Sequence, residues 1–244
     1  APMADEMKNH GSEKKYGQFH RRVFEANILN FAIWATIAIL IGGIVEIVPM
    51  FTPAGPEVSP DVTPYTALEV AGRDIYVAEG CYLCHSQWVR PMRAEILRYG
   101  PWSRAWEYQY DRPFQLGSRR IGPDLHRIGG KYPDAWHYEH MRDPRSTTPG
   151  SVMPSYSWLL TDRIDAGDVR ASLVALKKTG TPYTDADIAG VEESLAGQGG
   201  EIVGRLREAG IESEADRAII AVIAYLQRLG MDGRAALEKQ GIEY

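Results

Sequence analysis

The longest run of apolar residues lies near the start of the chain, at residues 28–51, and reads ILNFAIWATIAILIGGIVEIVPMF. Strongly polar side chains occur only towards its ends, at Asn30 and Glu46. A run of about 24 residues is long enough for an α-helix to cross the hydrocarbon core of a bilayer. A cleaved signal peptide would have a shorter apolar core. The pattern therefore predicts one membrane-anchoring helix.

Basic residues precede this run and are missing directly after it. They stand at Lys8, Lys14, Lys15, Arg21 and Arg22, and the next basic residue along the chain is Arg73. Positively charged flanks stay on the cytoplasmic side of a membrane. We therefore expect the N-terminus in the cytoplasm and everything after residue 51 on the outer side.

The rest of the chain shows mainly helical patterns. Residues 52–65 are rich in proline and predict a stiff linker. Residues 66–79 and 214–229 carry apolar stripes at helical spacing, and further helical patterns lie within 161–210. Residues 231–244 are polar and predict a mobile tail. No strand-rich region or internal repeat is present in the sequence, which favours a mainly α fold.

The candidate chemistry lies in the sequence Cys81-Tyr82-Leu83-Cys84-His85. Two cysteines three residues apart, followed at once by histidine, form the attachment pattern of a c-type haem. On one helical turn both sulfurs can reach the vinyl groups along one porphyrin edge, and the histidine can supply an imidazole nitrogen to the iron. The pattern predicts one covalently bound haem c, with Cys81 and Cys84 as attachment sites and His85 as an axial ligand.

Two other uses of the cysteine pair are less well supported by the sequence. The chain has only these two cysteines, whereas a structural zinc site normally needs four ligands from two clusters. A thioredoxin-like redox pair needs no histidine and expects a βαβ setting, which the helical patterns do not suggest.

Methionine is the candidate for the second axial ligand, because a thioether suits an electron carrier. Met153 is favoured, since Pro154 restricts the loop that holds it. Met141 lies in a helical-looking stretch and remains an alternative, whereas Met92 lies too close after His85. Ligation by a second histidine also stays open, with His126, His137 and His140 as the candidates.

Several other residues are candidates for the haem surroundings. The segment Ile121-Gly122-Pro123-Asp124-Leu125 resembles the cytochrome c loop in which the proline carbonyl accepts the proximal imidazole N–H, so Pro123 is assigned that role. Aromatic side chains that could wall the pocket are Tyr76, Trp88 and Trp136. Arginines that could pair with haem propionates, or equally lie on a solvated surface, are Arg90, Arg93 and Arg127.

Composition and the long insertion at residues 86–120 indicate what kind of partner to expect. The chain of 244 residues has a formal net charge of −5, which gives no support to nucleic-acid binding. In the insertion, seven arginines alternate with tryptophan, tyrosine and phenylalanine. This mixture is typical of buried protein contacts, although contact with lipid headgroups also stays open.

Three segments carry a family resemblance: GCYLCHSQWVRPMRAEILRYGPWS, DRPFQLGSRRIGPDL and SVMPSYSWL. Together they resemble the membrane-anchored mono-haem cytochrome c subunit, CcoO or FixO, of cbb3-type cytochrome c oxidases. The resemblance implies a non-catalytic subunit of an oxygen-reducing, proton-translocating complex in the bacterial inner membrane, with its haem domain in the periplasm. It also implies electron transfer from a di-haem cytochrome c subunit to the b-type haem of the catalytic haem–copper subunit. Finally, it implies a calcium ion at the subunit interface, near residues 99–103.

The expected fold is mainly α, with one N-terminal transmembrane helix and a periplasmic cytochrome c-like helical domain with insertions. The predicted divisions are a cytoplasmic N-terminus at 1–23, a transmembrane anchor at 24–51, a proline-rich linker at 52–65, a cytochrome c domain at 66–230 (with an insertion at 86–120 and an extra helical segment at 161–210) and a tail at 231–244. Competing hypotheses are an independent membrane-tethered electron shuttle, the cytochrome subunit of a nitric-oxide reductase, and a haem sensor with an open iron site.

Overall fold

The computed structural model describes residues 21–25, 27–50, 58–117, 119–239 and 241. They fall into two units, Ala1–Pro56 and Glu57–Tyr244, each with its own internal contacts. The described residues of the first unit form the π-helix η2 (Arg21–Glu25) and the α-helix α2 (Ile28–Met50). The second is a helical unit, and no β-strand occurs among the residues described, only an isolated bridge between Arg163 and Arg217. The mainly α prediction is therefore confirmed.

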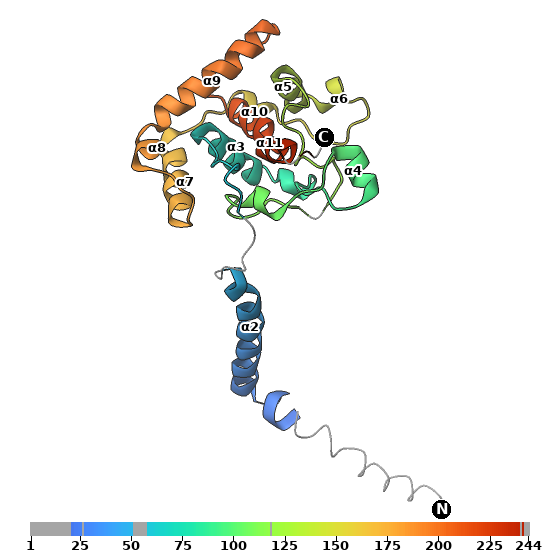
Figure 1. The fold of residues 1–244 in the computed structure, drawn as a ribbon, viewed down its shortest axis with the longest axis vertical. Coiled ribbons are helices and arrows are strands. Elements are labelled where there is room, and N and C mark those ends of the chain that lie inside the picture. The colour runs from blue at the N-terminus through green and yellow to red at the C-terminus, as the bar shows by residue number, and fades with distance from the viewer. Residues whose placement is uncertain (1–20, 26, 51–57, 118, 240, 242–244) are drawn as a thin grey trace, which may run out of the picture. The chain divides into compact units, whose positions relative to one another are not determined.

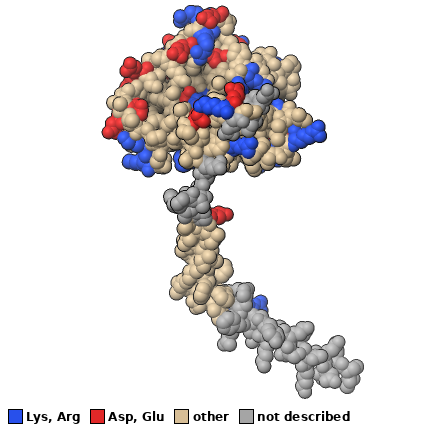
Figure 2. Space-filling view, in the orientation of Figure 1, with Lys and Arg blue, Asp and Glu red and all other residues tan. Residues whose placement is uncertain are grey.

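Helix α2 has the length and composition of a membrane span. Its stretch Ile28–Val48 has a mean hydropathy of 2.3, and none of it is buried within the protein. The space-filling view shows an almost uninterrupted uncharged surface along this helix (Figure 2). Apolar side chains exposed on every side of a helix are unfavourable in water and favourable in lipid. The expected apolar helix is thus present as a candidate membrane span, at Ile28–Met50 where 24–51 was predicted. Residues 26 and 51 of the predicted range lie outside the described residues.

The helical unit is built around two helices that pack closely on each other, α3 (Ala67–Ala78) and α10 (Ala218–Arg228). They lie together at the centre of the unit in Figure 1. Helix α10 is buried along most of its length, which explains why its sequence is almost wholly apolar. The two backbones meet at Gly72, where a Cβ atom would lie 1.9 Å from the carbonyl oxygen of Ala221. Only glycine permits this approach.

The remaining helical elements surround this pair. They are the 3-10 helix η3 (Cys81–Leu83), α4 (Arg93–Tyr99), η4 (Ala105–Tyr108), α5 (Asp134–Arg142), α6 (Pro144–Thr147), η5 (Ser157–Leu160), α7 (Ala166–Lys178), α8 (Asp185–Ala189), α9 (Val191–Glu208) and α11 (Met231–Lys239). Helices α7 and α9 pack on α3, and their apolar residues Val169, Leu173 and Leu206 belong to the main core. The segment 161–210 is therefore part of the scaffold of the unit.

The start of the helical unit differs from the stiff, extended linker expected at residues 52–65. Ser59 and Gln109 exchange hydrogen bonds of 2.9 Å, and Val62 is buried. The Thr63 N–H donates to Asp232 at 2.7 Å, and the Tyr65 carbonyl accepts from Tyr183 at 2.7 Å. Residues 59–65 are thus held against the domain. Residues 52–57 of the expected linker lie outside the described residues.

The end of the chain also differs from expectation. Residues 231–239 form helix α11, where a mobile tail was predicted. The Leu237 side chain is 0% exposed, and together with Ala236 it packs with Val62 and Trp106. The helix is therefore stabilised by tertiary packing of one short apolar face, which overrides its mostly polar composition.

Candidate haem-binding site

The Cys-x-x-Cys-His sequence forms a tight turn directly after α3. Gly80 adopts a left-handed conformation with φ of 69° and ends the helix. The N–H groups of Cys84 and His85 then donate to the Cys81 carbonyl at 3.1 and 2.9 Å. Neither cysteine forms a disulfide; Cys81 is half-buried and Cys84 is exposed. The turn therefore brings both sulfurs and the imidazole together within one short segment.

The environment of Cys81 argues against thiol chemistry. Burial raises the pKa of the Cys81 thiol to about 12. Reactive or metal-binding cysteines need a lowered pKa, because the thiolate is the nucleophile and the ligand. Cys81 is thus poorly suited to a redox pair or to a zinc site.

His85 is oriented by the loop Ile121–Leu125, which resembles the proline-containing loop of cytochromes c. Its Nδ1–H donates to the carbonyl oxygen of Pro123 at 2.8 Å, which is the contact expected. Burial lowers the pKa of His85 despite this hydrogen bond, so the imidazole is neutral at pH 7. A neutral ring with Nδ1 engaged leaves Nε2 as the atom available to a metal.

Gly122 allows the loop to lie directly against the imidazole. A Cβ at this position would lie 2.2 Å from Cε1 of His85 and 2.6 Å from its Nδ1. Backbone hydrogen bonds join the same two segments, from Gly122 to the Cys84 carbonyl at 3.0 Å and from Leu125 to the Ser86 carbonyl at 2.8 Å. The haem motif and the loop are therefore paired along several residues.

The loop that carries Met153 is tied to the surroundings of the cysteines. The Tyr156 N–H donates to the Met141 carbonyl at 2.8 Å, and the Trp158 Nε1–H donates to Glu79 at 3.1 Å, two residues before Cys81. Burial raises the pKa of Tyr156, and electrostatic interactions with Cys81 and Cys84 raise it further. Met153 itself is half-buried against the core.

The alternative ligands lie in different surroundings. Met141 is buried in the main core. His126 Nε2 bonds Glu107 at 2.9 Å, and the buried His137 ring makes edge contacts with both Tyr132 and Trp136. His140 engages Thr147 through Nδ1 at 2.6 Å, and its pKa is lowered by burial and then by His85. The effect of His85 on the pKa of His140 indicates that these two rings lie within electrostatic reach of each other.

The candidate propionate partners and pocket walls divide into engaged and exposed groups. Arg90 pairs with Glu95. Arg127 is buried in a salt bridge with Glu107, so its guanidinium is already engaged and does not fit the propionate role considered for it. Arg93 begins α4 and is exposed. Among the expected aromatic walls, Tyr76 is buried against Tyr225, Trp88 is partly exposed, and Trp136 stacks on Tyr132 and His140.

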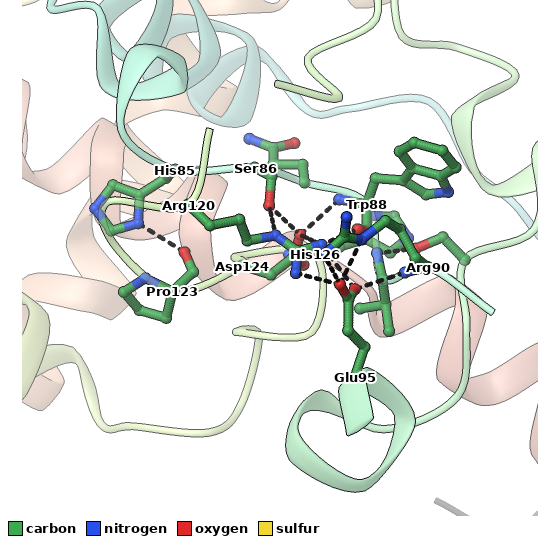
Figure 3. A network of polar contacts seen from close by, with 12 residues as sticks. His85, Ser86, Trp88, Arg90, Glu95, Arg120, Pro123, Asp124 and His126 are labelled. Carbon is green, nitrogen blue, oxygen red and sulfur yellow. Dashed lines mark hydrogen bonds and ion pairs between the residues drawn. The ribbon is translucent and has the colours of Figure 1, made fainter. Parts of the chain in front are cut away.

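A polar network beside His85 was not anticipated from the sequence. Figure 3 shows Arg120 and Asp124 between the haem motif and α4, with Arg120 bonded to Glu95 and Ser86. The partners are separated by 25 and 34 residues along the chain. The only sequence signal was that Arg120 stands directly before the Ile121–Leu125 segment, and this does not identify its partners.

These residues fit a c-type haem: a tight Cys-x-x-Cys-His turn, a neutral imidazole oriented by a proline carbonyl, and a glycine where the loop meets the ring. Together with the closely packed helices α3 and α10, they define a cytochrome c-like domain. No group of three or more His, Cys, Asp or Glu residues suited to a metal ion occurs within the described part of the chain.

The chain matches the sequence model of one family, described as cytochrome c oxidase, mono-haem subunit/FixO, over residues 20–232. It therefore belongs to the FixO family, and it is a mono-haem subunit of a cbb3-type cytochrome c oxidase. Comparison with individually curated proteins gives no significant match.

Proposed function

We propose that this subunit carries one haem c, bound covalently through Cys81 and Cys84, with His85 and Met153 as the axial ligands of its iron. It takes electrons from the di-haem cytochrome c subunit and passes them to the b-type haem of the catalytic subunit. The observation that carries the proposal is the hydrogen bond from His85 to Pro123, with Gly122 packed against the ring. A bound haem would supply a one-electron redox couple.

The chain's own residues would hold and tune that couple. Pro123 keeps the His85 ring in one tautomer and makes Nε2 a stronger donor. Met153 is proposed as the sixth ligand because its loop is linked to Glu79 through Trp158. A histidine and a thioether together raise a haem's reduction potential and suit an electron carrier. Arg90 and Arg93 are proposed near the propionates, with Arg90 held by Glu95.

We propose that four exposed apolar side chains, which stand close to the proposed haem ligands in the sequence, form an apolar rim that contacts a redox partner. We define it as Leu83, Ile121, Val152 and Trp158, which are 56%, 61%, 77% and 43% exposed. Leu83 lies inside the haem motif, Ile121 precedes Gly122, and Val152 precedes Met153. Exposed large apolar side chains mark protein contact surfaces. Electron transfer across such a rim would need no long path through the protein.

The membrane position and the calcium ion also belong to this proposal. Helix α2 would anchor the subunit in the bacterial inner membrane as a single pass, with the N-terminus in the cytoplasm and the haem domain in the periplasm. A calcium ion is proposed at the subunit interface near residues 99–103. The described residues of this chain supply no group of three His, Cys, Asp or Glu side chains suited to a metal ion, so the ligands would include backbone oxygens or groups of the partner.

Purification of the native complex tests the proposal. The chain should copurify in detergent with the catalytic and di-haem subunits, and the complex should contain b-type and c-type haems together with copper. A monomeric cytochrome after mild extraction would instead support an independent electron shuttle. A complex without copper would point to a nitric-oxide reductase.

A further inference from the structure

Asp124 is a buried carboxylate whose oxygens are all engaged next to the haem motif. Its side chain is 0% exposed. Oδ2 accepts from the Ser86 hydroxyl at 2.6 Å and from the Trp88 N–H at 2.8 Å, while Oδ1 accepts from the His126 N–H at 2.9 Å. Figure 3 shows these bonds beside the contact between His85 and Pro123. One side chain thus joins the chain leaving the haem motif to the loop after Pro123.

Arg120 compensates the buried charge of Asp124. Its Nη2 lies 3.5 Å from Asp124 Oδ2, and its two Nη atoms lie 2.7 and 2.8 Å from the oxygens of Glu95. Arg120 also donates to the Ser86 hydroxyl and to the Trp88 carbonyl. Buried charges persist when they are paired and hydrogen-bonded in this way.

The position of Asp124 links this network to the proximal imidazole. Asp124 follows Pro123, whose carbonyl bonds His85, and its partner Ser86 follows His85. The bonds of Asp124 therefore set how the two segments lie against each other at the point where the Pro123 oxygen meets Nδ1. A shift of either segment would lengthen or bend that bond.

We propose that Asp124 is a positioning residue for the haem ligand His85. By holding Ser86, the Trp88 N–H and the His126 N–H, it keeps the Pro123 carbonyl on Nδ1, and so it fixes the ring orientation and the donor strength of Nε2. This inference rests on the proposed haem site. Because a hydrogen bond to Nδ1–H strengthens the imidazole as a donor and favours oxidised iron, loosening it raises the reduction potential.

Two variants of the full-length, matured protein test the inference, each measured by redox titration and by electron paramagnetic resonance of the oxidised haem. Asp124→Asn keeps the shape but offers one oxygen to three donors. We expect the reduction potential to rise by about 59 mV, which corresponds to a tenfold shift towards reduced iron for a one-electron couple. The paramagnetic resonance spectrum should change as well. Ser86→Ala breaks one of the same bonds without changing a charge, and we expect a smaller shift of the same sign.

Glu69→Gln is the matched control. Glu69 is also a buried carboxylate with hydrogen bonds, and it lies 3.5 Å from its arginine partner, Arg228. It stands in the first turn of helix α3, and about 14 Å of helix separates it from the last helical residue, Ala78, before the haem motif. This variant removes a comparable charge away from His85, so the potential and the spectrum should stay as in the wild type.

The outcomes separate positioning from other roles of Asp124. A shift in Asp124→Asn with none in Ser86→Ala would assign the effect to charge alone and overturn the inference. If both variants lowered only the stability and left the potential and the spectrum unchanged, Asp124 would have a purely structural role, and the inference would also be overturned. If Asp124→Asn fails to fold, the reduction potential and the spectrum of Ser86→Ala test the inference, and unchanged values would overturn it. A wild-type chain without haem would instead refute the proposed function.

Discussion

Gly122→Ala perturbs the proposed proximal ligand directly. Gly122 has no positive φ, so alanine fits the backbone there and the effect comes from the added methyl group. That methyl would lie 2.2 Å from Cε1 of His85, 2.6 Å from Nδ1 and 2.7 Å from Nε2. To restore an ordinary contact of 3.4 Å, the ring must withdraw by about 1.2 Å. This movement is enough to break the 2.8 Å hydrogen bond to Pro123.

The size of the effect follows from these two changes. Overpacking at a close contact costs about 1–3 kcal/mol, and the lost hydrogen bond costs about 1 kcal/mol. We therefore expect the free energy of unfolding to fall by about 2–4 kcal/mol. The reduction potential should rise, because His85 loses the bond that strengthens it as a donor. Haem attachment should persist, since Cys81 and Cys84 are unchanged.

Denaturant unfolding followed by haem absorbance, together with a redox titration, measures both effects in the full-length chain in detergent. Gly204→Ala in α9 is the matched control, because nothing lies within 4 Å of its added methyl group. Alanine in a helix interior should raise stability by about 0.5–1 kcal/mol. If Gly122→Ala behaved like this control in stability and in potential, the assigned packing of loop and imidazole would be refuted.

Three further predictions address the second ligand, the pH dependence and the last helix. Met153→Ala should remove the weak long-wavelength absorption band of methionine–iron ligation and lower the reduction potential, whereas Met141→Ala should destabilise the core by about 2–5 kcal/mol and keep the band. Burial of Glu107 favours its protonation, but hydrogen bonds from Arg127 and His126 outweigh this and lower the pKa of Glu107 to about 2. The stabilising contribution of ionised Glu107 should therefore be complete above about pH 4.5 and be lost as the pH falls towards 2. Glu107→Gln should flatten the dependence of stability on pH over that window, and an unchanged slope would contradict this reasoning. Leu237→Ala should cost about 2–5 kcal/mol in urea unfolding, because the side chain is 0% exposed; a neutral result would mean that α11 does not pack as described.

The sequence predicted those parts of the molecule that depend on local pattern. The period of apolar residues placed α3 and α10, and the run at residues 28–51 placed α2. The contact between His85 and Pro123 was also expected, because it connects two recognisable motifs. These features need only local periodicity or a motif.

Contacts between distant segments could not be predicted in the same way. Arg90 and Arg127 look alike in sequence, yet Arg127 is buried on Glu107, 20 residues away, while Arg90 pairs with Glu95 near the surface. Asp124 gave no signal of its own, because its role depends on where Ser86 and Trp88 lie. Helix α11 was missed because it is stabilised by packing against Val62 and Trp106 more than by its own sequence.

Mass spectrometry of the intact polypeptide after extraction with acid and acetone tests the central claim most directly. This treatment removes haem that is held only by ligation and leaves haem that is joined through thioether bonds. We predict a polypeptide heavier by one haem, with no thiol at Cys81 or Cys84 available for alkylation. A polypeptide of unmodified mass with two free thiols would contradict the account.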